Sequence, residues 1–448
     1  MNEDFTSYKA FFAGKKITVM GLGLLGRGVG DVAFLAGLGA TLIVTDLKSK
    51  KELAPSLAKL SRFKNISFVL GQHRKKDFTS ADMVIKAAGV PLNSLYISAA
   101  EKAGVPVYMS SALFTAFAKE KGVTVVGITG TRGKSTVTHL VHHILTVAKH
   151  RVHLGGNVRG VSTLALLPKI KTGDVAILEL DSWQMQGFHT LKISPRISVF
   201  TSFMEDHLNY YGGSMQNYFE DKAAVYRYQD ANDIVISGPS ATSYIRKELK
   251  KVGGKYIAVR GSDVPKSWKR LLIGSHNDEN YACAISVARA LGVSETTIKK
   301  AVASFKPLSG RLELISSVRG VRIINDNNAT TPTATAAALS SLASAKARTI
   351  LIMGGADKTL SFEPLAQILQ KTKTPVVLLP GSGTDAFLKI HRGGSVLVTN
   401  LKDALYSALA LAKKGDTVLF SPACASFGLF KNEYDRNDQF VQLVKKLK

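Results

Sequence analysis

The chain has 448 residues, of which 45% are hydrophobic, and 59 lysines and arginines against 33 acidic residues give a formal net charge of +26. This length predicts about three domains. The chain has only two cysteines, Cys283 and Cys424, which argues against a disulfide framework or a cysteine metal site and favours a reducing, cytoplasmic compartment. Apolar runs fall short of the ~20 residues that span a bilayer, and the basic residues are scattered without an arginine-rich arm, so we expect neither a membrane nor a specific nucleic-acid partner.

The first predicted block, residues 1–112, contains a glycine turn between a strand and a helix. The strand is expected over Lys16–Met20, the turn follows as Gly21-x-Gly23-x-x-Gly26, and helical periodicity continues to Leu38. A second strand, Thr41–Thr45, ends at Asp46, about 20 positions after the last glycine of the turn. This pattern predicts a turn that binds a nucleotide diphosphate; the alternative is a tight turn that binds no ligand.

The second block, residues 113–307, carries the most specific motif. An apolar run, Val123–Ile128, leads into the glycine-rich segment 130–136, and a helical run, Val137–Ala148, follows. Glycine N–H groups and a helix N-terminus are typical binders of nucleotide phosphates, Lys134 can reach the terminal phosphates, and Ser135 or Thr136 can hold Mg²⁺. Ile128 stands where the usual Walker A loop has glycine, so this is the shorter G-T-x-G-K-S-T form. The alternative is a turn that only packs a helix on a strand.

Three further side chains of this block are candidates for the same site. Glu179 lies in the apolar strand run Val175–Leu180, where a carboxylate is costly unless it faces solvent or binds a cation such as Mg²⁺. His207 follows two acidic residues and could bind a metal or close a turn. Lys222 lies on an amphipathic helical stretch, and a lysine there is by default exposed to solvent.

The third block, residues 308–448, alternates strands with helices. The strands are expected over Arg322–Ile324, Thr349–Met353, Val376–Leu379, Val396–Val398 and Thr417–Phe420, and the helices over Thr333–Leu342, Phe362–Gln370 and Leu401–Ala412. This alternation predicts a doubly wound α/β fold. Gly354-Gly355 and Pro380–Gly383 stand at strand ends, where such sheets bind ligands.

With these residues the chain resembles the Mur ligase family, the ATP-dependent amide-forming enzymes of peptidoglycan assembly, over nearly its whole length. The matching segments are Gly21–Leu24, Ile128–Thr136, Gly155–Asn157, Leu178–Gln184, Glu205–His207, Lys222, His276-Asn277 with Asn280, Gly310–Glu313, Asn325-Asp326, Gly354-Gly355 with Lys358, Ser421–Phe427 and Phe430–Asn432. Each segment alone is weak evidence for the family, but the whole set in this order is specific to it. The segment Ser421–Ser426 is most similar to the members that add D-glutamate to UDP-N-acetylmuramoyl-L-alanine.

The resemblance implies an α/β fold of three domains. The N-terminal domain, residues 1–112, would be Rossmann-like and bind the UDP substrate rather than NAD. The central domain, residues 113–307, would be P-loop ATPase-like, with a mostly parallel sheet, and bind ATP and two Mg²⁺ ions. The C-terminal domain, residues 308–448, would be Rossmann-like, bind the amino acid and close on ATP. We expect a cytoplasmic monomer whose partners are UDP-N-acetylmuramoyl-L-alanine and D-glutamate.

The same resemblance implies roles for single residues. ATP would be bound by Gly130, Thr131, Gly133, Lys134, Ser135, Thr136, Asn280, Arg311 and Asp326. The substrates would be bound by Gly21, Leu22, Gly23, Leu24, Asp46, Asn157, Asp181, Gln184, Thr330, Lys358 and Ser426, of which Lys358 and Ser426 receive the amino acid. The metal ligands would be Ser135, Glu179, His207 and carbamylated Lys222, and the catalytic set Lys134, Glu179, His207 and Lys222. Carbamylation by CO₂ would turn a lysine into the oxygen donor that Mg²⁺ needs.

The implied reaction starts with phosphoryl transfer from ATP to a carboxylate. The carboxylate could lose only oxide as a leaving group, whereas the acyl phosphate can lose phosphate. The amine of the amino acid then attacks the acyl phosphate and gives an amide, ADP and phosphate. Some positions depart from the family pattern: Asn328 replaces a lysine, Glu433 an aromatic residue, Gly310 a histidine, and Ala87-Ala88 a Ser-Pro pair. Asn328 and Glu433 make the amino-acid pocket less positive, so the sequence leaves the identity of the amino acid open.

Two other interpretations stay open. The first is a ligase of the same fold with another acceptor, such as a folylpolyglutamate synthase or a pseudomurein-type ligase; the N-terminal glycine-turn domain speaks against the folate enzymes. The second is a silent nucleotide-binding regulator, for example an NAD sensor. The intact set Lys134, Glu179, His207 and Lys222 argues against that loss of activity.

Overall fold

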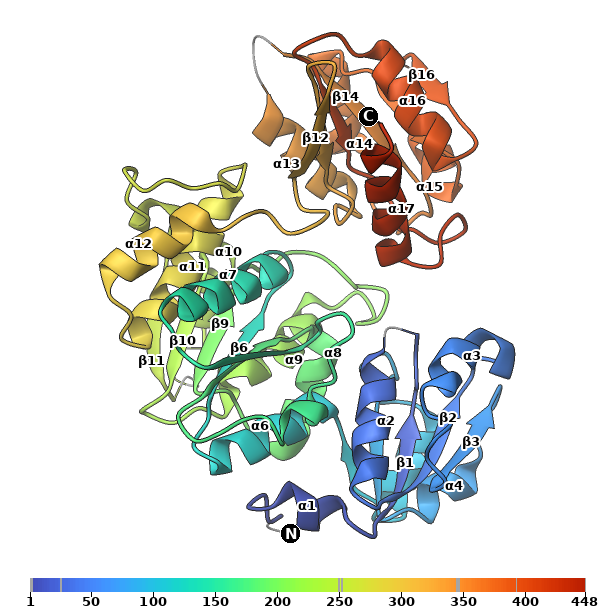
Figure 1. The fold of residues 1–448 in the computed structure, drawn as a ribbon, viewed down its shortest axis with the longest axis vertical. Coiled ribbons are helices and arrows are strands. Elements are labelled where there is room, and N and C mark those ends of the chain that lie inside the picture. Colours follow the sequence, from blue (N-terminus) through green and yellow to red (C-terminus); the bar gives the residue numbers. More distant parts are fainter. Residues whose placement is uncertain are drawn as a thin grey trace. The chain divides into compact units, whose positions relative to one another are not determined.

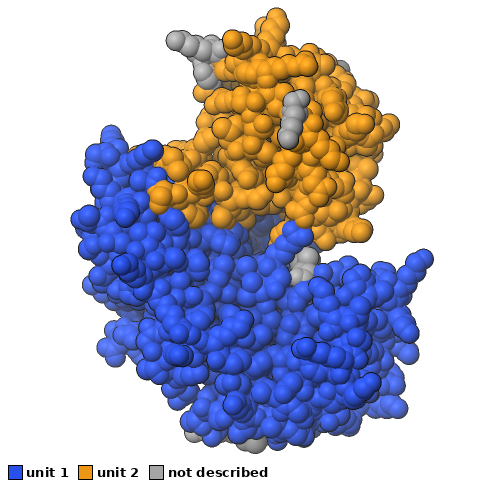
Figure 2. Space-filling view, in the orientation of Figure 1, with its two compact units in different colours: residues 1–269, 278–303 blue, residues 270–277, 304–448 orange. Residues whose placement is uncertain are grey.

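The computed structural model describes residues 3–24, 26–248, 250, 253–343, 347–391 and 393–447. The strands form three sheets, one within each segment for which the sequence predicts a domain (Figure 1). The chain divides into two compact units, residues 1–269 with 278–303 and residues 270–277 with 304–448 (Figure 2). The first unit contains two of the sheets and the second unit contains the third. The domain boundaries at 112 and 307 stay predictions.

The first sheet is parallel, with the strand order β3-β2-β1-β4-β5. Its strands are β1 (Lys16–Met20), β2 (Thr41–Asp46), β3 (Ile66–Leu70), β4 (Met83–Lys86) and β5 (Val107–Tyr108), and its helices are α1 (Tyr8–Phe12), α2 (Arg27–Gly37), α3 (Lys50–Ala58), α4 (Lys75–Thr79) and α5 (Leu95–Lys102). Successive strand side chains point to opposite faces. Ile17 and Val19 accordingly pack with α2, whereas Met20 packs with α4 and α5 on the other face.

The second sheet is also parallel, with the order β11-β10-β9-β6-β8-β7. The strands are β6 (Thr124–Thr129), β7 (Val152–Gly156), β8 (Val175–Glu179), β9 (Ile197–Phe200), β10 (Ile234–Ser237) and β11 (Lys255–Ala258). The helices are α6 (Ser110–Glu120), α7 (Lys134–Val147), α8 (Ser182–Leu191), α9 (Met215–Arg227), α10 (Pro239–Arg246), α11 (His276–Ala290) and α12 (Glu295–Ser304). Apolar side chains of α6, α8, α9 and α10 share one core with this sheet and with the α2 face of the first sheet.

The third sheet has the order β12-β13-β17-β14-β15-β16 and is parallel except for the β12–β13 pair. The strands are β12 (Glu313–Val318), β13 (Val321–Asn325), β14 (Thr349–Gly354), β15 (Val376–Leu379), β16 (Ser395–Leu397) and β17 (Thr417–Phe420). The helices α13 (Pro332–Leu342), α14 (Glu363–Thr372) and α15 (Ser382–Leu388) cover one face, and α16 (Leu401–Leu411) and α17 (Glu433–Lys445) cover the other. This two-sided cover confirms the predicted doubly wound fold.

Two of the differences from the sequence prediction have a clear physical reason. β12 pairs antiparallel with β13 and was not predicted, because its side chains are mostly half-buried or exposed and give no buried run. α7 begins at Lys134, three residues before the predicted start at Val137, because its polar first turn shows no apolar periodicity. Within the part of the chain that the structure describes, no helix combines the length and apolar character needed to cross a membrane.

Candidate active site

The phosphate loop predicted from the sequence connects β6 to α7. Gly130 and Gly133 have φ angles of 142° and 86°, a region that glycine enters without strain. A Cβ atom on Gly130 would collide with the Thr201 hydroxyl, and one on Gly133 would collide with Asn280 Oδ1. The loop therefore needs glycine for space as well as for conformation. This packing brings Asn280 of α11, a predicted ATP ligand, to the N-terminus of α7.

Two lysines converge on one backbone oxygen of the phosphate loop. Lys134 Nζ and Lys222 Nζ each lie 2.9 Å from the carbonyl oxygen of Gly130. Lys134 also donates to the carbonyl oxygen of Thr131 at 3.3 Å. Ammonium groups that share a neutral oxygen repel each other, so an anion bound at this loop would relieve the repulsion.

Lys222 is buried, with 1% of its surface exposed, so the default expectation of a solvent-exposed lysine is wrong. Tertiary packing buries Lys222: α9 packs against the phosphate loop, and the Lys222 ammonium lies 4.9 Å from the centre of the Tyr218 ring. Burial lowers the pKa of Lys222 well below its usual value, and the charge of Lys134 lowers it further. This environment favours the neutral amine, which is the nucleophilic form of lysine.

The remaining residues of the loop are held by the segment that follows β9. Thr131 N donates to the carbonyl oxygen of Ser202 at 2.7 Å, and Arg132 N donates to the Ser202 hydroxyl at 2.8 Å. The guanidinium of Arg132 donates to Asp206 at 3.0 Å. Sequence reasoning missed Arg132 and Ser202, because their contact joins segments about 70 residues apart and no local pattern reports it. In the first turn of α7, Ser135 is half-buried and Thr136 is buried.

Glu179 ends β8 beside the loop. It is paired in register with Ile128 of β6, and only 6% of its surface is exposed. Its carbonyl oxygen accepts from the backbone N–H of Asn157 at 2.6 Å. The structure thus brings a buried carboxylate next to the strand that leads into the phosphate loop, as the sequence predicts. Buried carboxylates require hydrogen bonds or a cation.

His207 lies in the turn that follows Asp206, with a positive φ of 53°. Its ring centre lies 5.1 Å from that of Trp183 and 6.2 Å from that of Tyr218, and its carbonyl oxygen accepts from Tyr210 N at 2.9 Å. His207 therefore closes a turn, and its ring lies near side chains of α8 and α9. Among the described residues, no group of three or more His, Cys, Asp or Glu side chains forms a metal cluster.

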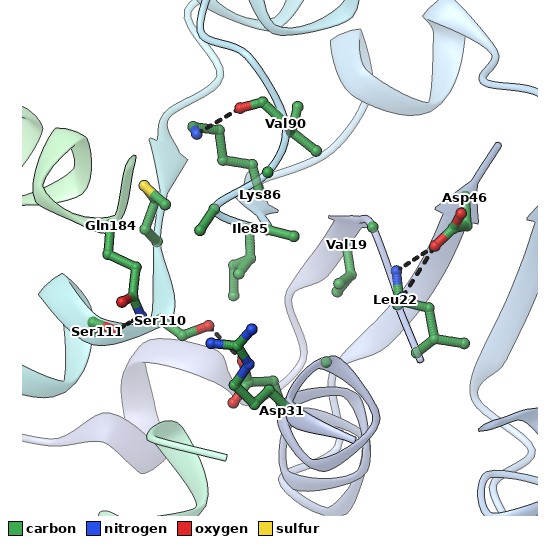
Figure 3. A pocket seen from close by; sticks show the side chains of 18 of the residues that line it. Val19, Leu22, Asp31, Asp46, Ile85, Lys86, Val90, Ser110, Ser111 and Gln184 are labelled. Atoms are coloured by element: carbon green, nitrogen blue, oxygen red, sulfur yellow. Dashed lines mark hydrogen bonds between the residues drawn. The ribbon is translucent and has the colours of Figure 1, made fainter. Parts of the chain in front are cut away.

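A pocket of about 450 Å³ opens at the carboxyl ends of the first sheet (Figure 3). Its walls include the predicted substrate residues Gly21, Leu22, Gly23, Leu24, Asp46 and Gln184, together with the basic residues Arg27, Lys48, His73 and Lys86. A volume of this size suits a small ligand or part of a larger one. Residues 110, 111, 156, 161 and 163 also line it, so the pocket lies between the first and second sheets.

Asp46 fixes the glycine turn of this pocket. Its carboxylate accepts from Leu22 N at 2.9 Å, from Gly23 N at 3.1 Å and from Lys48 N at 2.9 Å. Figure 3 shows the first two of these bonds. Two N–H groups of the predicted diphosphate turn therefore bind a carboxylate of the protein in this structure.

One polar contact joins the two sheets near the pocket, and another joins two helices of the second sheet in the pocket wall. Asn157 Oδ1 accepts from the guanidinium of Arg27, and Gln184 Nε2 donates to the Ser111 hydroxyl at 2.9 Å. Asp181 and Gln184 form a capping box at the start of α8, in which Gln184 N donates to Asp181 Oδ1 at 2.8 Å. Asp181 and Gln184 thus stabilise the start of α8. Gln184 also lines the pocket, and Asn157 contacts the pocket residue Arg27.

In the second unit, Asp326 follows β13 and is buried. Its carboxylate accepts from the Ser421 hydroxyl at 3.0 Å and from Leu312 N at 3.2 Å. Burial raises the pKa of Asp326 to about 7, although these hydrogen bonds and the charge of Arg311 lower it. The structure therefore places the two predicted ATP residues of this unit, Arg311 and Asp326, in one electrostatic neighbourhood.

The raised pKa of Asp326 predicts a pH-dependent stability. The folded pKa of about 7 exceeds the usual 3.8, so this group stabilises the fold fully only below about pH 4, and its contribution is lost as the pH rises through 7. We expect Asp326→Asn to lose less thermal stability than the parent between about pH 5 and pH 8. Unfolding midpoints at both pH values check this, with Asp385→Asn, an exposed position on α15, as the control. An equal pH response of Asp326→Asn and the parent would contradict it.

The predicted amino-acid residues follow neighbouring strands of the third sheet. Ala356 and Ala425 exchange backbone hydrogen bonds of 3.0 Å, which ties the loop after β14 to the loop after β17. Lys358 and Ser426 therefore stand on adjoining loops, Lys358 half-buried and Ser426 buried. Thr330 lies on the turn after β13, where its N–H donates to Asn328 O at 3.1 Å.

Two of the departures from the family pattern, Asn328 and Glu433, lie together. Asn327 Nδ2 donates to Asn328 Oδ1 at 3.2 Å and to the carbonyl oxygen of Glu433 at 2.9 Å. The buried guanidinium of Arg436 donates to Asn327 Oδ1 at 2.8 Å and to the Cys424 carbonyl oxygen at 3.1 Å. Asn328 and Glu433 thus belong to one cluster that also touches the segment before Ser426.

The glycine loop between β6 and α7 and the three doubly wound sheets define a P-loop α/β protein of several domains. Family models match most of the chain: "Mur ligase MurD-like, N-terminal domain" over residues 15–109, "Mur ligase middle domain" over 128–269 and "Mur ligase, glutamate ligase domain" over 310–424. The chain belongs to the Mur ligase family, and it is therefore an enzyme of the ligase class.

Curated relatives match over nearly the full length. The UDP-N-acetylmuramoylalanine–D-glutamate ligase of Roseiflexus sp. (strain RS-1) is 34% identical over 96% of this chain and 98% of its own. The protein of the same name from Borreliella burgdorferi is 35% identical over 96% of this chain and 97% of its own. The one from Clostridium botulinum is 31% identical, and the match covers 100% of both chains.

Solved structures share the fold at lower identity. UDP-N-acetylmuramate–alanine ligase MurC from Thermotoga maritima has a TM-score of 0.63 and 19% identity, over 97% of this chain and 100% of that one. MurF ligase from the same organism, in complex with ADP, has a TM-score of 0.60 and 18% identity, over 90% and 94%. A pseudomurein peptide ligase type C from Methanothermus fervidus has a TM-score of 0.54 and 18% identity, over 97% and 100%. These likenesses confirm the α/β fold class.

Proposed function

We propose that this chain is a cytoplasmic, ATP-dependent ligase of peptidoglycan synthesis that adds D-glutamate to UDP-N-acetylmuramoyl-L-alanine. The names of the full-length relatives support this choice of substrates. The observation that carries the chemistry is the convergence of Lys134 and Lys222 on the carbonyl oxygen of Gly130, 2.9 Å from each ammonium nitrogen. A cation at a glycine loop and a helix N-terminus is what the terminal phosphates of ATP require.

We assign ATP to the loop residues 130–136, with Asn280 near the adenine and Arg311 and Asp326 as contacts from the C-terminal domain. The ADP complex of MurF ligase supports nucleotide binding by this fold. Magnesium fits the donor set: Ser135 offers a hydroxyl, and Glu179 offers the oxygens of a buried carboxylate. Mg²⁺ in nucleotide sites uses one or two carboxylates with substrate phosphates and water, so no larger protein cluster is needed. Bound there, Mg²⁺ would neutralise charge on the transferring phosphoryl group.

We further propose that Lys222 is carbamylated and serves, with His207 and Glu179, as a metal ligand. CO₂ reacts with a neutral amine, and the lowered pKa of Lys222 favours that form. Carbamylation would replace a buried cation beside Lys134 by an anion. It would therefore turn a repulsive pair into an attractive one and supply an oxygen ligand for a second Mg²⁺ ion.

The 450 Å³ pocket is the proposed site of the UDP substrate. Its glycine turn, with Asp46, would hold the uridine diphosphate part, and Asn157, Asp181 and Gln184 would line the path toward Glu179. Thr330, Lys358 and Ser426 would hold D-glutamate, whose two carboxylates need a cation such as Lys358. This division assigns residues 1–112, 113–307 and 308–448 to the UDP substrate, ATP and the amino acid.

The proposed reaction has two steps. A carboxylate oxygen of the alanine residue attacks the γ-phosphorus, the bond from phosphorus to ADP breaks, and Lys134 offsets the charge on the departing oxygens. The amine of D-glutamate then attacks the acyl carbon, phosphate leaves, and the amine loses a proton. Both steps depend on holding anionic reactants in line, which Lys134 and the helix N-terminus favour.

Phosphate release tests the proposed function. With UDP-N-acetylmuramoyl-L-alanine and ATP present, we expect turnover with D-glutamate to exceed turnover with L-glutamate, D-aspartate or glycine. The less positive cluster around Asn328 and Glu433 makes this panel the sharpest test of the amino acid. Turnover with another amino acid alone would indicate a related ligase. Binding of NAD in preference to a uridine nucleotide would overturn the assignment of the first pocket.

A further inference from the structure

Lys86 is a buried cation for which the reaction above has no use. It ends β4, 2% of its surface is exposed, and it lines the 450 Å³ pocket (Figure 3). Its ammonium donates to the carbonyl oxygen of Val90 at 2.9 Å and to Gln186 Oε1 of α8 at 3.4 Å. Burial lowers the pKa of Lys86 to about 8, while the charges of Asp181 and Asp221 raise it. A buried ammonium with neutral acceptors is costly, so it calls for a reason.

Gln186 links Lys86 to the helix that carries Lys222. Its Oε1 faces the Lys86 ammonium, and its Nε2 donates to Asp221 Oδ2 at 2.9 Å and to the Tyr210 hydroxyl at 3.1 Å. A carboxamide has one accepting and one donating end. A cation on the oxygen side and a carboxylate on the nitrogen side therefore fix the orientation of the Gln186 amide.

Asp221 and Lys222 clamp α9 on two sides. The Tyr211 hydroxyl donates to Asp221 Oδ2 at 2.9 Å, beside the bond from Gln186. The next residue, Lys222, reaches Gly130 O on the phosphate loop. Consecutive helix residues point about 100° apart, so these two contacts together set the rotation of α9 about its axis.

We propose that Lys86, Gln186 and Asp221 form a strut that positions α9, so that Lys86 acts as a positioning residue for Lys222. The strut starts at the wall of the pocket of the first sheet and ends one residue from Lys222. Its importance for catalysis rests on the proposed carbamylation of Lys222, whereas its effect on α9 does not. If Lys86 loses its charge, Lys222 loses its alignment, although Lys86 itself touches no reacting atom.

Lys86→Met tests the strut without leaving a new buried charge unpaired, because Asp221 keeps its bonds to Gln186 and Tyr211. The control is Lys102→Met, an exposed lysine at the end of α5. Hydrogen exchange of the peptide spanning residues 215–227, followed by mass spectrometry, reports α9 directly. Loss of a charge-assisted hydrogen bond should speed its exchange about tenfold in Lys86→Met and not in Lys102→Met.

Gln186→Leu breaks the strut at its centre and serves as the second variant. We expect the same faster exchange of residues 215–227, together with a kcat about tenfold lower at nearly unchanged KM for ATP in both strut variants. Added bicarbonate should restore part of this kcat, because a misaligned Lys222 needs more CO₂ to stay carbamylated. A defect that was only structural would not respond to bicarbonate.

The outcomes separate the two proposals. If residues 215–227 exchange at the same rate in Lys86→Met, Gln186→Leu and the parent, the proposed strut is overturned. Faster exchange with unchanged kcat overturns the positioning role of Lys86. A third outcome is that exchange is faster in the variants but the parent protein releases no phosphate with D-glutamate. In that case the strut stands and the proposed function is overturned.

Discussion

Lys134→Ala should lower ATP-dependent ligation by about 10²–10³-fold, because it removes an ammonium group that lies at the phosphate loop. In the structure this ammonium lies 2.9 Å from the Gly130 carbonyl oxygen, a contact that it would exchange for the phosphates of ATP. Removal of the side chain leaves the glycine turn and the helix N-terminus intact. The variant should therefore fold, retain weak nucleotide binding and lose mainly the stabilisation of the transferring phosphoryl group.

Steady-state phosphate release with all three substrates measures this effect, and calorimetric titration with ATP measures the remaining affinity. Lys299→Ala, an exposed lysine on α12, is the matched control and should behave like the parent. Lys134→Arg keeps the charge, but its planar, forked head cannot replace a compact ammonium, so it should recover little activity. Ligation by Lys134→Ala at the parental rate would refute the nucleotide role of the loop and the reaction built on it.

The sequence predicted the parts of the site that are local in the chain. The loop 130–136 shows its glycines, its lysine and its flanking strand and helix within a single segment. Glu179 was found because a carboxylate inside an apolar run is costly wherever the run folds. Lys86 closes the apolar run of β4 in the same way, and this signal could have identified it as well.

Other parts of the site arise only when distant segments meet. The amphipathic pattern around Lys222 indicates a helix but not what covers that helix, and burial of Lys222 depends on the loop some 90 residues earlier. The bond from Arg27 to Asn157 joins residues 130 positions apart. For Asp46, sequence reasoning predicted a place near a ligand; its bonds to the turn depend on backbone geometry that residue types do not specify.

Lys222→Ala should lower ligation by about 10²-fold or more, since a metal ligand at the transferring phosphoryl group contributes several kcal/mol. Added acetate or formate should restore part of the activity, because the space left by the buried side chain admits a small carboxylate that supplies the missing oxygen donor. Lys222→Met fills that space with an apolar chain of similar length. It should be as inactive as Lys222→Ala and should not respond to acetate.

This pair of variants separates carbamylation from a purely structural lysine. Phosphate release with and without acetate measures rescue, and circular dichroism checks that both variants fold. A ¹³C signal of a carbamate in parent protein incubated with labelled bicarbonate should be missing from both. Because CO₂ reacts with the neutral amine, this signal should grow with pH, in the direction set by the lowered pKa of Lys222. Full activity of Lys222→Ala without acetate would contradict the carbamate, and equal rescue of both variants would show that acetate acts elsewhere.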